Sequence, residues 1–362
     1  MPDHLSPAAP SAEEDIRLSA ARQWLAQQAG YDITSLRAAS ADASFRRYFR
    51  LDRQAPDSGC AILMDAPPEK EPLEPFLRVR EILRDAGLRA PRVYAQDADS
   101  GFLLLEDFGQ QTFLQHLSQA MTQDPHGLLA RPLYARAWQA LIQAQCYGLQ
   151  TPQSLTGLPA YDRDRLMQEM AIFPQWYLQR HLEITLTEAD NDQLQQVFDR
   201  LAERAISQLQ VIVHRDFHSR NLMVLEDAED LGILDFQDAV VGPVTYDLVS
   251  LLRDAYVAWP EPVQIDWAAR YWQEARAQAI SLPDDFGQFY RDFEFMGLQR
   301  HLKVLGIFAR LSIRDGKHGY LQDIPRVLGY AKKVAERYDE LGPLARLLQR
   351  AAGTVPQTHY TF

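Results

Sequence analysis

The stretch of sequence that decides the fold is Val211-Ile-Val-His-Arg-Asp-Phe-His-Ser-Arg-Asn221, followed by Leu222-Met-Val-Leu225 and Ile233-Leu-Asp-Phe236. It predicts an apolar strand, a polar loop, and two short apolar strands with an acidic residue after the second. Short buried strands form a rigid scaffold for the polar side chains between them. Catalytic and binding residues of proteins often lie on loops positioned in this way. We therefore expect the functional residues of the chain in this segment.

The polar loop matches the pattern H-R-D-x-x-x-x-N of a kinase catalytic loop, beginning at His214 and ending at Asn221. In this pattern Asp216 is the catalytic base, which accepts a hydrogen bond from the acceptor hydroxyl and orients it toward the γ-phosphoryl group of ATP. Asn221 and Asp235 supply hard oxygen ligands for Mg²⁺, and His214 supports the loop. A strand-end turn would explain H-x-D alone, but the flanking strands, the asparagine and the later acid together argue against it.

The order of predicted elements indicates two lobes. A helix over residues 12–29, short strands at 36–38, 45–51, 60–64, 93–95 and 102–106, and a helix over 76–86 precede a mainly helical remainder. The sequence therefore predicts an α+β, bilobal, protein-kinase-like fold. Residues 1–105 form the small β-rich, nucleotide-binding lobe, and residues 106–362 form the large helical lobe with the catalytic loop and the acceptor site.

Composition narrows the function further. The chain has 362 residues, a formal net charge of −12 and two cysteines. An acidic chain is a poor partner for nucleic acid, and no apolar run approaches the roughly 18 residues that span a bilayer. The first residues lack the order of a signal peptide, so we expect a cytoplasmic protein. Nothing in the sequence indicates an obligate protein partner.

Two other segments spell the D-F-G metal motif of protein kinases, at Asp107–Gly109 and Asp285–Gly287. The metal carboxylate must follow the catalytic loop by a short hairpin, and only Asp235 does so. Because Phe236 is followed by glutamine rather than glycine, the pattern argues against a protein kinase. It resembles instead the aminoglycoside phosphotransferase and choline kinase-like superfamily. By that resemblance, Asp247 in Gly-Pro-Val-Thr-Tyr-Asp-Leu begins a helix and braces the catalytic loop.

The superfamily resemblance also implies a nucleotide site, and here the sequence departs from the pattern. Backbone groups near Glu106 and Phe108 would face the adenine, although an ordinary buried strand explains the same residues. The phosphate loop lacks glycine, so Ser44 and Arg47 are expected to contact the phosphates; an ion pair within the lobe is equally open for Arg47. The strand over residues 60–64 has no lysine. An arginine (Arg46, Arg47 or Arg78) must replace it, or the phosphates rest on metal and backbone.

Several further strings are similar to one bacterial branch of the superfamily, the N-acetylmuramate/N-acetylglucosamine anomeric kinase family of peptidoglycan recycling. They occur at residues 42–48, 63–68, 105–109, 214–221 and 234–239. The resemblance implies ATP-dependent phosphorylation of the C1 hydroxyl of a free amino sugar. The expected partner is therefore a small-molecule amino sugar, and the expected cofactors are ATP and Mg²⁺.

Sugar sites combine aromatic platforms with hydrogen-bonding acids and arginines, so we expect Glu169, Trp176, Arg220 and Arg300 to contact the acceptor. There are two alternatives to these substrate contacts. The helix over residues 169–177 would pack against the core, and the charges of Arg300 and Lys303 would be solvated. Two other functions stay open. Acidic clusters favour an aminoglycoside-type antibiotic phosphotransferase, although Arg300 and Lys303 oppose a polycationic substrate. The missing strand lysine favours a catalytically impaired nucleotide-binding regulator.

Overall fold

The computed structural model describes residues 12–40, 45–54, 59–121, 124, 126–225 and 231–354. The chain divides into two compact units: residues 1–81 with 90–110, here called the N-terminal unit, and residues 82–89 with 111–362, here called the C-terminal unit. Helix α2 (Leu73–Asp85) is divided between them after Glu81. No helix in the described ranges is long and apolar enough to cross a membrane.

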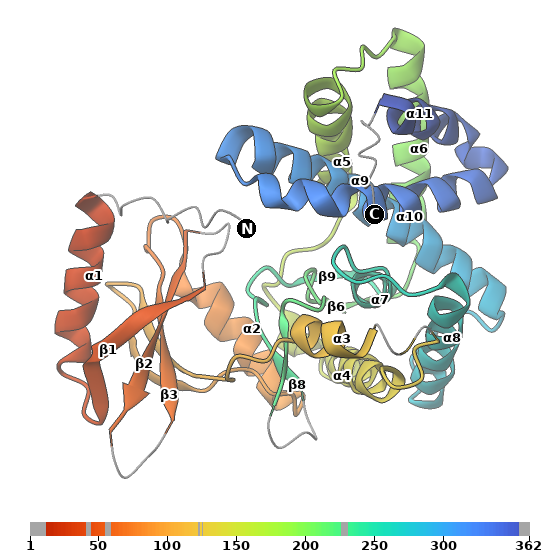
Figure 1. Cartoon of the computed structure of the whole chain (residues 1–362). Helices are drawn as coiled ribbons and strands as arrows, with labels where there is room; N and C mark the ends of the chain where they lie inside the picture. Colours follow the sequence, from red (N-terminus) through yellow and green to blue (C-terminus); the bar gives the residue numbers. More distant parts are fainter. Residues whose placement is uncertain are drawn as a thin grey trace. The chain divides into compact units, whose positions relative to one another are not determined.

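The N-terminal unit contains one antiparallel five-stranded sheet and the helix α1 (Ala12–Leu25) (Figure 1). The strand order is β1-β2-β3-β5-β4. The strands are β1 (Tyr31–Ser40), β2 (Arg47–Arg53), β3 (Cys60–Asp65), β4 (Val93–Asp97) and β5 (Phe102–Glu106). The predicted helix and all five predicted strands are thus present; β1 is longer than its short apolar run suggested, because polar residues on both sides of the run also pair with β2.

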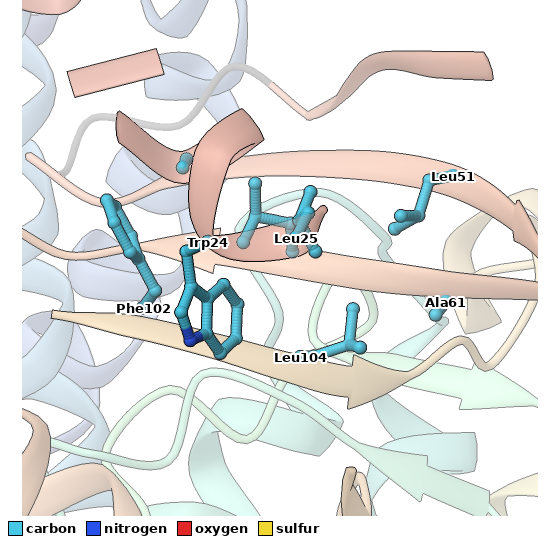
Figure 2. Close-up of a cluster of buried hydrophobic side chains, with 8 residues drawn as sticks. Trp24, Leu25, Leu51, Ala61, Phe102 and Leu104 are labelled. Atoms are coloured by element: carbon cyan, nitrogen blue, oxygen red, sulfur yellow. The ribbon is translucent and has the colours of Figure 1, made fainter. Parts of the chain in front are cut away.

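The core of this unit lies between α1 and one face of the sheet. Figure 2 shows Trp24 and Leu25 of α1 directed at side chains that alternate along the strands. On β3 these are Ala61 and Leu63, which are fully buried. The rings of Trp24 and Phe102 lie with their centroids 5.8 Å apart. Alternation with period two therefore assigns one face of the sheet to this core.

The same face also carries a buried ion pair. Asp65 continues the alternation of Ala61 and Leu63, and its side chain is fully buried. The Nε of Arg17 on α1 donates to it at 2.9 Å, and Arg47 on β2 donates to its other oxygen. A carboxylate removed from water needs such partners, so Asp65 ties α1 to two strands.

The C-terminal unit is mainly helical, with two short two-stranded sheets. Strand β6 (Gln210–Val213) pairs with β9 (Val240–Pro243), and β7 (Leu222–Val224) pairs with β8 (Leu231–Ile233). The sequence predicted β6, β7 and β8 but no strand at the position of β9. Its backbone pairs with β6, with Val213 opposite Val240 in the register. The strand was not predicted because glycine and proline, at its end, are uncommon in strands.

The helices of this unit surround a long central one, α9 (Phe286–Asp315), which packs against α5, α6, α7 and α10 (Figure 1). The α-helices are α3 (Phe113–Met121), α4 (Arg131–Gln150), α5 (Arg163–Ile172), α6 (Glu188–Ile206), α7 (Tyr246–Leu252), α8 (Glu261–Ala277), α10 (Ile324–Arg337) and α11 (Gly342–Thr354). A π-helix, η2 (Phe173–His181), continues α5, and 3₁₀ turns occupy η1 (Pro152–Leu155), η3 (His318–Asp323) and η4 (Asp339–Leu341).

One contact of α9 needs a residue without a side chain. A Cβ on Gly306 would lie 2.6 Å from the backbone carbonyl carbon of Ile172, at the end of α5. Backbone at that distance cannot rotate away as a side-chain end can. The close approach of α9 to α5 therefore depends on glycine at this position.

We expect Gly306→Ala to lower the free energy of unfolding by about 1–3 kcal/mol, because overpacking outweighs the gain in helix propensity. Gly297→Ala, in the same helix, is the matched control: its Cβ would meet Val249 at 3.4 Å, an ordinary contact. That variant should keep or slightly raise stability. Urea unfolding of both variants measures the difference, and equal stability of the two would contradict the proposed close approach.

Candidate active site

The loop between β6 and β7 carries Asp216 and is closed by its own backbone. The N–H of His218 donates to the carbonyl of Asp216 at 3.0 Å, and the N–H of Asn221 donates to the carbonyl of His218 at 2.9 Å. The side-chain amide of Asn221 also donates to the carbonyl of Asp216, at 3.0 Å. These bonds make a tight turn that fixes Asp216 relative to Asn221.

The start of the loop is held by Asp247, in the first turn of α7. This buried carboxylate accepts hydrogen bonds from the backbone N–H groups of His214, at 2.6 Å, and of Arg215, at 3.0 Å. Burial raises the pKa of Asp247 to about 7, against the lowering effect of the two donors. The imidazole of His214 lies 3.0 Å from the carbonyl of Leu234, which connects the loop to the segment before Asp235.

A second carboxylate, which the sequence analysis missed, holds the middle of the loop. Asp254 follows α7 and is 2% exposed. One of its oxygens accepts the N–H of Ser219 at 2.8 Å, and the other accepts the N–H of Tyr256 at 2.8 Å. The only signal in the sequence is an acid two residues beyond the end of a short apolar helix, and that pattern is common.

Two residues of the site adopt left-handed backbone conformations although they are not glycine. Arg215 has φ of 77° and Asp235 has φ of 60°. Such conformations cost free energy for a residue with a Cβ and persist only where the surroundings impose them. Here they occur in the two segments that the sequence singled out for chemistry, one before Asp216 and one at the acid after β8.

Asn221 and Asp235 meet in space. The amide nitrogen of Asn221 lies 3.2 Å from a carboxylate oxygen of Asp235, and Gln237 donates to the other oxygen at 2.7 Å. The described part of the chain contains no group of three or more His, Cys, Asp or Glu side chains suited to a metal. A pair of hard oxygen donors nevertheless fits Mg²⁺, which takes one or two protein ligands and completes its shell with phosphates and water.

Asp216 is surrounded by cations. Arg300 of α9 lies 3.9 Å from its carboxylate, and the side chain of Asp216 is 41% exposed. Burial tends to raise the pKa of Asp216, but Lys303, Arg300 and Arg215 outweigh it and lower the pKa to about 2. The carboxylate is therefore ionised at neutral pH and can accept a hydrogen bond from a hydroxyl group.

The cations are in turn neutralised by Glu169, at the end of α5. Its carboxylate pairs with Arg215 at 2.5 Å and with Lys303 at 3.1 Å, and it accepts the hydroxyl of Tyr161. Lys303 and Arg300 are each 7% exposed. The alternative that these α9 charges are solvated is thus wrong: the helix points them into the unit, toward Glu169 and Asp216.

The remaining predicted acceptor contacts occupy different positions. Trp176, on η2, is half-buried, and the guanidinium of Arg180 covers its ring at 4.1 Å. Arg220 is exposed and lies in the catalytic loop, directly before Asn221. Among the four predicted residues, Arg220 and Arg300 are the two that the structure places beside Asp216 or in its loop.

The predicted nucleotide contacts belong to the N-terminal unit. Ser44 lies outside the described residues. Of the two roles open for Arg47, the structure shows the ion pair within the unit, since it binds Asp65 on the face that α1 covers. Glu106 ends β5, where its carboxylate accepts the N–H of Arg92 at 3.2 Å, and Phe108 follows it in the chain.

Both D-F-G segments outside the catalytic region have structural uses. Asp107 pairs with Arg50 of β2 at 2.5 Å and accepts the N–H of Gly109 at 2.9 Å. Asp285 caps the N-terminus of α9 by accepting the N–H of Gln288 at 3.0 Å. Neither carboxylate needs a metal to explain its position.

A protein-kinase-like fold with a braced Asp216 loop and a facing Asn221–Asp235 pair defines a phosphotransferase. Residues 35–284 match the model of the phosphotransferase enzyme family, so the chain belongs to that family.

The chain is 41% identical to N-acetylmuramate/N-acetylglucosamine kinase of Neisseria meningitidis, over 97% of this chain and 100% of that one. It is 45% identical to the kinase of the same name from Pseudomonas aeruginosa, over 86% of each chain. Among solved structures it resembles the ADP-bound aminoglycoside phosphotransferase APH(2'')-Ib, with a TM-score of 0.56, 14% identity and coverage of 87% and 98%. An ethanolamine kinase of Plasmodium vivax gives a TM-score of 0.59 at 10% identity, covering 91% and 92%. These structures share the fold.

The brace on the catalytic loop can be tested by removing its carboxylate. Asp247→Ala leaves two buried N–H groups without an acceptor, and we expect it to lower the free energy of unfolding by about 2–4 kcal/mol. Turnover should fall at the same time, because the loop loses its fixed position. Asp238→Ala, a change of the same kind at an exposed site, should stay within about 0.5 kcal/mol of the parent. Chemical unfolding curves decide; matching curves for the two variants would show that the brace is not needed.

Proposed function

We propose that the chain transfers the γ-phosphoryl group of ATP to the C1 hydroxyl of N-acetylmuramate and N-acetylglucosamine, as in peptidoglycan recycling. The observation that carries this proposal is the 41% identity, over the full length of the relative, to a kinase named for these two sugars. The positions of Asp216, Asn221 and Asp235 support the reaction type. A reaction that consumes ATP on free amino sugars also favours the cytoplasm as its location.

Asp216 is proposed to hold the acceptor hydroxyl. Phosphoryl transfer passes through a loose transition state, so the protein contributes mainly position and charge stabilisation. A carboxylate with a pKa of about 2 is a weak base, which suits an orienting role more than early removal of the proton. The backbone bonds to Asp247 and Asp254 keep Asp216 in place for this role.

Asn221 and Asp235 are proposed to hold Mg²⁺. When bound, the ion would neutralise charge on the phosphates of ATP. Asp235 is held for this by Gln237 and by its left-handed backbone conformation. The chain's own contribution is thus a pair of oxygen donors fixed by the loop and the β7–β8 hairpin.

The nucleotide site is proposed in the N-terminal unit, with Ser44, Glu106 and Phe108 near the ATP. Arginines that could replace the missing lysine of β3 have carboxylate partners. Arg46 pairs with Glu71 at 2.7 Å, and Arg47 pairs with Asp65. Arg78 pairs with Glu74 at 3.1 Å. These pairs favour the alternative in which metal and backbone carry the phosphates.

The antibiotic phosphotransferase alternative is disfavoured by charge. A polycationic acceptor needs carboxylates around the catalytic base, but Asp216 is surrounded by Arg215, Arg300 and Lys303. The regulator alternative is disfavoured by the complete set of Asp216, Asn221 and Asp235 in one braced arrangement.

Incubation with Mg-ATP and a panel of acceptors tests the proposal. We expect phosphorylation of N-acetylmuramate and N-acetylglucosamine, with a phosphorus NMR signal of an anomeric sugar phosphate, and none of choline or kanamycin. Turnover of kanamycin or choline alone would keep the reaction type and overturn the substrate. Silence with every acceptor, with ATP still bound, would favour the regulator.

Asp216→Asn tests the role of the carboxylate. The variant keeps the shape of the side chain but removes its charge, and we expect kcat to fall by about 100-fold or more, with the affinity for ATP retained. Asp238→Asn, the same change at an exposed acid, is the control. Steady-state kinetics and ATP titration give both values. A near-normal kcat in Asp216→Asn would contradict the proposed role of Asp216 in catalysis.

A further inference from the structure

The guanidinium group of Arg220, in the catalytic loop, lies over an aromatic ring. Its guanidinium carbon lies 3.7 Å from the ring centroid of Tyr256 and 5.9 Å from that of Tyr320. The imidazole of His218 contacts the same Tyr256 ring edge-on, with centroids 5.4 Å apart. A cation–π contact restrains the guanidinium group and leaves its N–H donors able to bind a ligand.

The aromatic support is itself fixed. Tyr256 packs on Phe308 of α9, with centroids 6.3 Å apart, and Phe308 packs on Tyr320 of η3 at 5.2 Å. The N–H of Tyr256 is bound by Asp254, the carboxylate that also holds Ser219 of the catalytic loop. The stacked arginine and the loop of Asp216 therefore share one anchor within the C-terminal unit.

Arg220 differs from the other cations near Asp216 in having no acidic partner within the described ranges of the chain. Lys303 pairs with Glu169 at 3.1 Å, and Arg215 pairs with the same carboxylate. Arg300 donates to Ser250 at 2.6 Å and is 7% exposed. Arg220 is exposed and lies over the two rings. It is the cation of this group that can still pair with an external anion.

We infer that Arg220 binds the carboxylate of an acidic acceptor sugar and so sets the preference between the two proposed substrates. This inference rests on the proposed function. N-acetylmuramate carries a lactyl carboxylate and N-acetylglucosamine does not. A fixed guanidinium fork binds a carboxylate through two parallel hydrogen bonds, and the half-buried rings of Tyr256 and Tyr320 add an apolar surface of the kind that sugar sites use.

Arg300 and Lys303 of α9 are less suited to bind this carboxylate, because both are buried and engaged with side chains of the chain itself. Releasing either for a ligand would leave Glu169 or Asp216 with less compensation, at a high cost in free energy. Arg220 can bind without breaking an existing ion pair.

Arg220→Gln tests the inference through a ratio. We expect kcat/KM for N-acetylmuramate to fall about 10- to 100-fold more than kcat/KM for N-acetylglucosamine, the loss typical of a hydrogen bond to a charged group. The difference should shrink with added salt, because Arg220 is exposed. Arg220→Lys should give an intermediate ratio, since it keeps the charge and loses the fork. Arg276→Gln, at an exposed arginine stacked on Trp272 at 4.8 Å, is the matched control and should leave the ratio unchanged.

A substrate change completes the test. The methyl ester of N-acetylmuramate removes the charge, so the parent protein should distinguish acid from ester and Arg220→Gln should not. Equal losses for both sugars, with a raised KM for ATP, would overturn the inference in favour of a phosphate contact. An unchanged ratio would overturn it as well. If the parent protein phosphorylates neither sugar, the proposed function itself has failed, which is a distinct outcome.

Discussion

The arrangement of the active site depends on the bond between one buried carboxylate, Asp247, and two backbone N–H groups in the catalytic loop. Without it, Arg215 would have no reason to keep a left-handed conformation, and Asp216 would lose its direction. Burial of the acceptor makes this bond costly to break, because neither partner can turn to water. Asp254 likewise accepts the backbone N–H of Ser219, so α7 and the residues after it hold the loop at two points.

The second constraint is charge balance in a confined space. Three cations lower the pKa of Asp216, yet cations buried without partners would destabilise the unit. Glu169 offsets part of this positive charge by pairing with Arg215 and Lys303. Because those partners are occupied, the surroundings of Asp216 are fixed before a substrate arrives, and Arg220 remains as the cation open to a ligand.

The sequence predicted the elements that follow local rules. The alternating strands of the N-terminal unit and the strand–loop–strand around Asp216 were visible because periodicity and a spaced motif depend on neighbours in the chain. Strand β9 was missed because its pairing with β6 is a long-range contact and its end carries glycine and proline. Asp254 was missed because an acid near a helix end has many ordinary explanations.

By itself, the sequence determined the fold class, the family and the identity of the three residues expected to carry the chemistry, since these follow from residue types at fixed spacing. Only the tertiary structure decided which charges are available. In the sequence, nothing distinguishes Arg220 from the cations Arg47, Arg300 and Lys303. In the structure, Arg47, Arg300 and Lys303 contact carboxylates or hydroxyls of the chain. The physical reason is that an ion pair depends on distance in space, and residues that meet, such as Glu169 and Lys303, lie far apart along the chain.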